Sequence, residues 1–312
     1  MRRLLNLNNI TLIIGIALLI WLISEYNFGA AIREMQNARP IFLIYAFIAF
    51  LIFPLLKFIP WYYVIRKLGI KLRKTISLLT MYAYFGLGII PAAAGQLILL
   101  KGLERFKKRY KYFSGNIVIS LTLTDFLSVS IIALLTAIIV SKYVAYTIAV
   151  VAVAYVIASI LGLNRTNDLI LRAVRRFGPL KRFTKYVETM RNRSVLSQKD
   201  ILYEMITFFP TIIAEGSLIF FILLALNQNV SLAMSLFIFS FSAMVGSISM
   251  IPFGIGSMDA VIIALLLTNG VPGVISISTV VIFRIFNTIL PTGISYGIFT
   301  FLQGKKQNKK IH

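Results

Sequence analysis

Residues 251–260 read IPFGIGSMDA, and they interrupt a long apolar run. Pro252, Gly254 and Gly256 break the helical pattern, and the acid Asp259 follows at once. Inside a bilayer, irregular backbone is tolerated only where it is buried in protein or lines a cavity. An ionisable side chain at that depth marks a functional site by default. The segment therefore predicts a broken helix that carries an intramembrane site.

The composition is that of an integral membrane protein. Of the 312 residues, 59% are hydrophobic and 13% are charged, and the mean hydropathy is +0.88. Apolar runs of about 20 residues, the length of a membrane-spanning helix, recur along the chain. We expect an all-α, polytopic membrane bundle of about 7–8 crossings, with one or two re-entrant or broken helices. The candidate crossings are residues 10–28, 40–65, 112–140, 142–161, 201–226, 231–250 and 274–302.

The net charge of +22 is concentrated in short segments between the candidate crossings. A cytoplasmic excess of Lys and Arg sets membrane topology, so these segments are expected to face the cytoplasm and attract anionic head groups. The charge therefore does not indicate nucleic-acid binding. The sequence predicts a multi-pass protein of the cell membrane with cytoplasmic N- and C-termini. The basic segments, which hold 27 of the 32 Lys and Arg residues, are 2–3, 66–74, 101–111, 162–200 and 305–310.

Residues that carry most enzyme chemistry are scarce. The chain has no cysteine, and its one histidine is the last residue, His312. Disulfides and thiol chemistry are thereby excluded, and no metal or cofactor is expected. Nucleotide-binding loops, a Gly-x-Ser-x-Gly elbow and paired Asp-rich motifs are also missing. We therefore do not expect a self-contained enzyme.

The domain organisation is predicted to be a single membrane domain made of two halves. The linking segment is polar, basic and amphipathic, and it is expected to lie on the cytoplasmic surface. Whether the broken element crosses the membrane or is re-entrant stays open. The predicted parts of the domain 1–312 are half one, 1–161, with a re-entrant element at 75–100; the basic segment 162–200; and half two, 201–312, with the broken element at 251–268.

The two halves carry similar backbone breaks. Pro91 and Gly95 are four residues apart, as are Pro252 and Gly256, and each pair lies between apolar runs. Two Pro/Gly-interrupted segments in corresponding halves are typical of a transporter binding site. Proline and glycine are also common in membrane helices generally, so a true repeat stays open.

Three acids lie deep within candidate crossings or at the break. Asp125 is near the centre of 112–140, Glu215 is near the middle of 201–226, and Asp259 is at the break. Isolated charges at these depths are unfavourable by several kcal/mol, so they are expected to pair or to line a wet cavity. The excess of acid suits a protonatable site or a cationic head group.

One base, Arg284, lies ten residues into the last candidate span, with Asn287 on the same helical face. Its pairing with Asp259 or Glu215 would satisfy both charges. The alternative to a working site is a static ion pair that fixes the helix register. Lys57 is closer to the inner boundary, and we expect its amino group to reach the surface.

The motif at the break resembles the flippase-like family built on the lysylphosphatidylglycerol synthase transmembrane region. That family shows Pro-Gly-Gly-x-Gly, then Asp or Glu at the start of a helix; here it reads Pro252-Phe-Gly-Ile-Gly-Ser-Met-Asp259. A Gly-Val turn at 270–271, Arg284 and Pro291 follow in the family's order.

The N-terminal half resembles the same family less closely. The family's Pro-x-x-x-Gly-Glu hairpin stands here as Pro91 to Gly95 and Gln96, so an amide replaces the acid. In the next span the family often has Glu-Arg-x-x-Asp, of which this chain keeps Asp125.

The resemblance implies a stand-alone member that moves a phospholipid or isoprenoid-linked lipid between leaflets. Its lipid would be an anionic phospholipid or an isoprenoid phosphate. The alternatives are an ion-coupled transporter of a small solute and a membrane subunit that presents an isoprenoid phosphate to a separate glycosyltransferase. A homo-oligomer and a transferase partner stay open. The implied lipid-contacting residues are Asp259, Arg284, Glu215, Asp125, Gln96 and Asn287, with backbone breaks at Pro91, Gly95, Pro252, Gly254 and Gly256.

Overall fold

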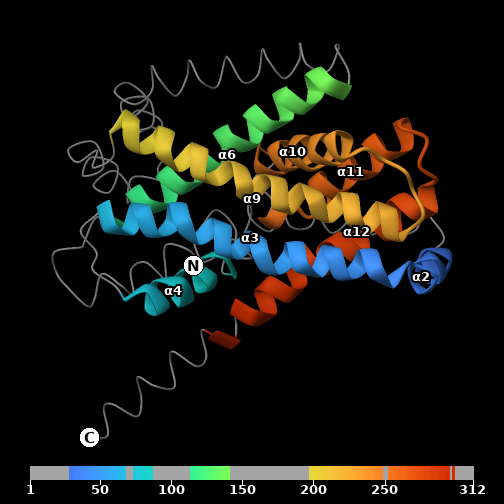
Figure 1. The fold of residues 1–312 in the computed structure, drawn as a ribbon, viewed down its shortest axis with the longest axis horizontal. Helices are drawn as coiled ribbons and strands as arrows, with labels where there is room; N and C mark the ends of the chain where they lie inside the picture. The colour runs from blue at the N-terminus through green and yellow to red at the C-terminus, as the bar shows by residue number, and fades with distance from the viewer. Residues whose placement is uncertain are drawn as a thin grey trace, which may run out of the picture.

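The computed structural model describes residues 28–67, 73–86, 113–140, 197–248, 252–295 and 297–298. Within these ranges every regular element is a helix, which confirms the predicted all-α membrane bundle (Figure 1). The elements are α2 (Phe28–Gln36), α3 (Pro40–Lys67), α4 (Lys74–Gly86), α6 (Phe113–Val140), α9 (Gln198–Ala225), α10 (Leu232–Ile248), the short 3-10 turn η5 (Pro252–Gly254), α11 (Ser257–Thr268), α12 (Gly273–Arg284) and the π-helical η6 (Ile285–Ile289).

Five of the predicted crossings coincide with helices of the structure: α3, α6, α9, α10 and the helix that begins with α12. Within the described ranges, three helical stretches are long and apolar enough to cross a membrane: Pro40–Lys67, Lys199–Ala225 and Gly273–Ser295. The predicted crossings 10–28 and 142–161 lie outside the described residues, apart from residue 28. Most of the basic segment 162–200 and residues 87–100 of the predicted re-entrant element lie outside them too.

Helices α3 and α9 lie side by side and run in opposite directions (Figure 1). At one end, the Arg39 N–H donates to the Ala225 carbonyl at 2.8 Å. At the other end, Lys67 Nζ lies 2.9 Å from Asp200 Oδ1. We call this second end the basic end, because α3 finishes there with Arg66 and Lys67. These contacts fix which residues of the two helices share a level.

The start of α9 is set by a capping box at the basic end. Ser197 Oγ accepts from the Asp200 N–H at 3.3 Å, and the Ser197 N–H donates to Asp200 Oδ2 at 2.8 Å. Such reciprocal bonds satisfy N–H groups that have no partner inside the helix. The Tyr63 hydroxyl from α3 donates to the same carboxylate. One acid therefore both starts α9 and ties it to α3.

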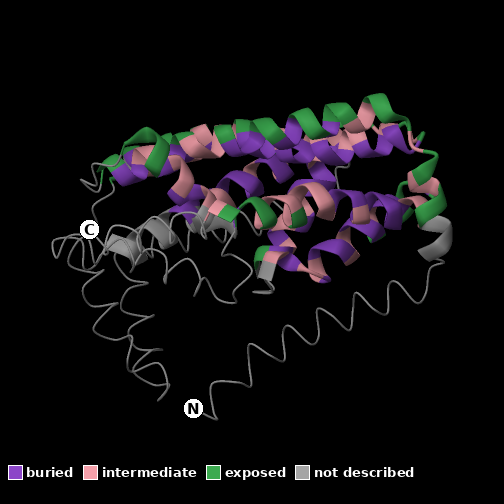
Figure 2. Ribbon diagram, turned by 90° about the horizontal axis from the view of Figure 1, so that it is seen from below, coloured by how far each residue is buried: buried purple, intermediate pink, exposed green. Residues whose placement is uncertain are grey.

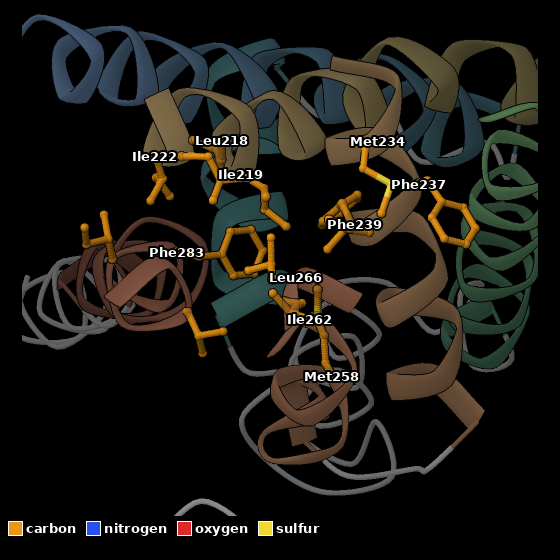
Figure 3. Packing of buried hydrophobic residues seen from close by; sticks show 14 of the residues in the cluster. Leu218, Ile219, Ile222, Met234, Phe237, Phe239, Met258, Ile262, Leu266 and Phe283 are labelled. Atoms are coloured by element: carbon orange, nitrogen blue, oxygen red, sulfur yellow. The ribbon is translucent and has the colours of Figure 1, made fainter. Parts of the chain in front are cut away.

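The apolar core lies between α9, α10, α11 and α12. Figure 3 shows Leu218 and Ile222 of α9, Phe239 of α10, Leu266 of α11 and Phe283 of α12 within one buried cluster. Van der Waals packing of this kind holds helices together in lipid, where the hydrophobic effect between helices is weak. The core therefore brackets the break between α10 and α11.

Large apolar side chains cover the outer face of α3, where Figure 2 shows one long edge of the bundle coloured as exposed. A patch of this length is rare on a soluble monomer. It is the expected surface where a helix contacts lipid tails. The exposed residues include Ile41, Ile44, Phe47, Ile48, Leu51, Ile52, Leu55 and Ile59.

Two features of the described helices were not predicted from the sequence. α2 packs against α12 where the sequence was interpreted as a connector. After Arg284 the helix widens into the π-helical η6, which ends just before Pro291. Pro291 has no N–H to offer the carbonyl four residues back, and its ring crowds that carbonyl, so a wider turn relieves the clash.

α11 has 12 residues and a rise of about 18 Å, too short to cross a hydrocarbon core of about 30 Å.

Candidate functional site

The break between α10 and α11 has an unusual backbone. Phe253 has φ of 53°, and Gly254 and Gly256 have φ of 61° and 86°. Glycine adopts positive φ without strain, whereas Phe253 is a bulky residue in a region that such residues rarely occupy. The predicted break is therefore present, and Gly254 and Gly256 are where the chain needs glycine.

Gly254 is required for packing as well as for its φ. A Cβ at Gly254 would lie 3.1 Å from the Gly246 Cα and 3.0 Å from the Met258 Cβ. The sequence pairs Gly246 with Ser242 as small residues one turn apart, a pattern that lets helices approach closely. Here the backbone of the break packs directly against Gly246 of α10.

Asp259 is fully buried and bonded on both carboxylate oxygens. Its Oδ2 accepts from the Gly256 N–H at 2.8 Å, which caps the start of α11. Its Oδ1 accepts from Arg284 Nε at 2.7 Å. A carboxylate near a helix N-terminus also interacts favourably with the helix dipole. Asp259 thus joins the first turn of α11 to α12.

Arg284 bridges the break with four hydrogen bonds. Besides Asp259, its Nη1 donates to the Phe253 carbonyl at 2.9 Å and to Thr288 Oγ1 at 3.2 Å, and its Nη2 donates to the Gly254 carbonyl at 3.2 Å. Carbonyls that face away from a helix need such donors in a bilayer. We call Asp259, Arg284 and the carbonyls of Phe253 and Gly254 the break cluster. Of the two partners predicted for Arg284, Asp259 or Glu215, the structure shows Asp259.

A second ionic cluster lies between α3, α6 and α9. Lys57 Nζ is 3.6 Å from Glu215 Oε1, and both side chains are almost buried. Asp125 of α6 interacts electrostatically with both of them. Each of the three residues lies in the middle third of its helix. We call Lys57, Glu215 and Asp125 the mid-bundle cluster.

The position of Lys57 corrects the sequence interpretation. Its side chain is only 13% exposed and faces Glu215, so its amino group does not reach the surface as expected. Pro54 and Pro60 on either side lie within an unbroken α3. Glu215 therefore pairs with Lys57 rather than with Arg284.

A polar face of α9 links the mid-bundle cluster with the basic end, and part of it was missed in the sequence. Asp200, Glu204, Thr211 and Glu215 are all buried. Their spacings of four, seven and four residues place them on one helical face. Glu215, with Thr211 one turn before it, was recognisable from the sequence, whereas Asp200 and Glu204 were not assigned to this face, although their spacing was readable. We call these four residues the α9 polar face.

Several predicted site residues are not brought into these clusters. Asn287 lies in η6, next to Thr288 but outside the bonds that hold Arg284. Pro91, Gly95 and Gln96 lie outside the described residues. Within the described ranges, no group of three or more His, Cys, Asp or Glu side chains could hold a metal ion.

A groove of about 300 Å³ opens between α3 and α9 on the lipid-facing side. Its rim includes exposed Ile48 and Ile52, and the small residue Ala49 is buried within it. It also reaches Ala214, which precedes Glu215 in the chain. The groove is almost entirely apolar and is lined by Tyr45, Ile48, Ala49, Ile52, Ala214, Ser217 and Phe221.

The sequence matches the family described as the lysylphosphatidylglycerol synthase TM region over residues 9–295. Among curated proteins, none matches this chain. Because the match extends over most of the 312 residues and includes both ionic clusters, the chain belongs to the lysylphosphatidylglycerol synthase TM region family.

Proposed function

We propose that this membrane protein moves a lipid, either an anionic phospholipid or an isoprenoid phosphate, between the two leaflets. The family links the chain to lipid handling, which supports the proposal. The tail of the lipid would stay in the bilayer while its head group passes through a polar path inside the bundle.

The observation that carries this proposal is that an apolar groove and the mid-bundle cluster are formed by the same two helices. The groove lies between the same two helices, α3 and α9, that hold Lys57 and Glu215. Ile52 of its rim is five residues from Lys57, and Ala214 adjoins Glu215. An amphipathic lipid needs this combination, because its tail favours an apolar surface and its head group needs polar partners away from water.

The mid-bundle cluster has the chemistry to handle a head group. Lys57 would attract a phosphate as a point charge, and Glu215 and Asp125 would take a cationic group or a proton. Its Lys57–Glu215 separation of 3.6 Å leaves these charges less tightly bonded than those of the break cluster. Asp259 and Arg284 would then stabilise the helices that surround the path. Contact of the lipid with Arg284 stays a prediction.

We place the protein in the cell membrane with its basic end on the cytoplasmic side. Arg66 and Lys67 support this orientation through the bias of Lys and Arg toward the cytoplasm. We further propose that the chain is no self-contained enzyme, and that a separate transferase would supply any synthesis.

The test is lipid movement by the purified full-length chain in sealed liposomes. The vesicles would contain phosphatidylglycerol, phosphatidylcholine or polyprenyl phosphate carrying a fluorescent head group. An impermeant reductant then quenches the outer leaflet, and any further quenching reports movement from the inner leaflet. We expect quenching well beyond half with the wild type and at least a tenfold slower rate with Glu215→Gln.

The control variant is Ser130→Ala, which removes a hydroxyl of α6 that bonds only within its own helix in the described structure. It should move lipid at the wild-type rate. A labelled pool that stays near half with every lipid and every variant would contradict the proposal. That result would direct attention to the transport of a small solute or to a role that requires a partner protein.

A further inference from the structure

The α9 polar face extends from the surface of the basic end to the middle of the bundle. Asp200 lies beside Lys67, whose side chain is 48% exposed. Glu204 follows one turn later and is fully buried, and Glu215 lies 15 residues beyond Asp200. At about 1.5 Å per residue, the carboxylates span about 22 Å of the helix axis. Buried carboxylates in a row at membrane depth are typical of proton relays.

Thr211 lies between the carboxylates of Glu204 and Glu215, and its hydroxyl also points to a water path. It is completely buried on the same helical face as Glu204 and Glu215. Its Oγ1 has no hydrogen-bond partner among the described residues, although most helical hydroxyls of this chain donate to a carbonyl of the preceding turn. A buried hydroxyl without a partner is unfavourable by about 1–3 kcal/mol unless something polar occupies its neighbourhood.

Pro210 lies inside α9 at the same level, but on its exposed side, as does Ile206 four residues earlier, whose side chain is 55% exposed. The carbonyl that Pro210 leaves without an N–H donor therefore does not face the path. The Thr211 hydroxyl is the polar group between Glu204 and Glu215 on the polar face. Thr211 is about 6 Å along the axis from Glu215 and about 10 Å from Glu204, distances that one to three hydrogen-bonded waters bridge.

Among the described helices packed against α9, two contribute charged groups to this path. α3 contributes Lys57 and Lys67 with the Tyr63 hydroxyl, and α6 contributes Asp125. α10 has no titratable residue, and the base of α12, Arg284, is bonded to Asp259. Among the described residues, proton binding at Glu215 therefore depends chiefly on the charges of Lys57 and Asp125.

We propose that the α9 polar face conducts protons from the basic end to the mid-bundle cluster, and that protonation of Glu215 is coupled to lipid movement. This inference rests on the proposed lipid translocation. A proton enters at the Glu204 carboxylate, one turn inside the bonded Asp200, passes through waters held by the Thr211 hydroxyl, and binds a Glu215 oxygen. Glu215 gives up this proton to the opposite side of the membrane when it pairs with Lys57 again, so one proton crosses in each cycle and no other reactant is needed. Neutral Glu215 then releases Lys57 to bind the lipid phosphate.

The experiment follows protons and lipid separately in the same vesicles. The full-length chain is reconstituted with a pH-sensitive dye inside and head-group-labelled phosphatidylglycerol in the bilayer. A pH step is applied with the membrane potential clamped by potassium and valinomycin. The variants are Thr211→Val, which keeps the shape and removes the hydroxyl, Thr211→Ser, which keeps the hydroxyl, and Glu204→Gln.

A matched control is Thr136→Val in α6, because that buried hydroxyl already donates to the Ile132 and Ala133 carbonyls of its own helix. We expect the wild type and Thr136→Val to carry protons faster than protein-free vesicles. Thr211→Val and Glu204→Gln should carry them at least tenfold more slowly, and Thr211→Ser should restore most of the rate. Lipid movement should respond to the pH step in the wild type and lose that response in Thr211→Val.

Two outcomes separate the two proposals. Lipid movement that ignores the pH step, with equal proton flux in the wild type, Thr211→Val and Glu204→Gln, would overturn the proton path and leave lipid translocation standing. Proton flux that depends on Thr211, in vesicles where no lipid moves, would support the path and overturn the lipid translocation.

Discussion

The two buried ionic clusters differ in how completely their charges are bonded. In the break cluster, Asp259 uses both oxygens and Arg284 makes four hydrogen bonds at 2.7–3.2 Å. In the mid-bundle cluster, Lys57 and Glu215 are 3.6 Å apart, with Asp125 as a second acid. The first arrangement binds the backbone of the break, whereas the second joins charged side chains of three helices over a longer distance. Buried charge in one membrane protein can thus serve architecture in one place and transport in another.

Neutralising each cluster gives the largest expected contrast. Asp259→Asn with Arg284→Met leaves the Phe253 and Gly254 carbonyls without their donors, so we expect a loss of roughly 3–5 kcal/mol in the free energy of unfolding. Thermal unfolding in detergent, followed by tryptophan fluorescence, measures it. A double variant that unfolds at the wild-type temperature would show that the break does not need these bonds.

The glycine at the centre of the break provides the next test. Gly254→Ala forces a Cβ into a positive φ and to within 3.1 Å of the Gly246 Cα. We expect a loss of about 2–5 kcal/mol, because the left-handed conformation is unfavourable by about 1–2 kcal/mol and overpacking by about 1–3 kcal/mol. The matched control is Gly293→Ala, whose Cβ meets no atom within 4 Å. Equal unfolding temperatures for the two variants would refute the packing argument.

The corresponding neutralisation of the mid-bundle cluster should hardly change stability. Replacing a buried ionic cluster by neutral groups of similar shape is often neutral, so the triple variant Lys57→Met, Glu215→Gln and Asp125→Asn should unfold within about 1–2 kcal/mol of the wild type. Its lipid movement should nevertheless fall at least tenfold. The comparison of the two clusters would fail if this variant unfolded as readily as the break-cluster double variant.

The smallest expected effect concerns the contact between α6 and α9. Ser128 Oγ lies 3.2 Å from the Met205 carbonyl and 2.6 Å from the Thr124 carbonyl. Ser128→Ala should lower the free energy of unfolding by about 0.6 kcal/mol, the typical value for such bonds between membrane helices. Chemical denaturation beside Ser130→Ala would resolve the difference. A loss above about 2 kcal/mol would mean that Ser128 organises the mid-bundle cluster more strongly than its bonds indicate.

The break cluster was largely predictable from the sequence because its cause is local. Pro252, Gly254 and Gly256 are residues that end helices, and Asp259 lies where a carboxylate caps the next one. Arg284 was the only base deep in the last span, so its pairing with a nearby acid followed. The helical crossings were predictable for the same reason, since each depends on the composition of one continuous segment.

The mid-bundle cluster was not predictable, because it depends on which helices are neighbours. The residues around Lys57 in the sequence do not indicate that α3 packs against α9. Its distance from the predicted inner boundary was therefore the only guide, and it suggested that the amino group reached the surface. Glu204 was missed for a different reason. The crossing was predicted to begin at residue 201, which assigned Asp200 to the basic segment and concealed the spacing that it shares with Glu204 and Glu215.

The most direct test of this division of roles compares two single variants, Glu215→Gln and Asp259→Asn, for both unfolding temperature and lipid movement. In Glu215→Gln, Lys57 keeps Asp125 nearby, so the protein should unfold as the wild type does and move lipid at least tenfold more slowly. Asp259→Asn should lower the unfolding temperature, because Arg284 loses its charged partner at the break. The opposite pattern would contradict the account: a stable Asp259→Asn that moves no lipid, beside a Glu215→Gln that moves it at the wild-type rate.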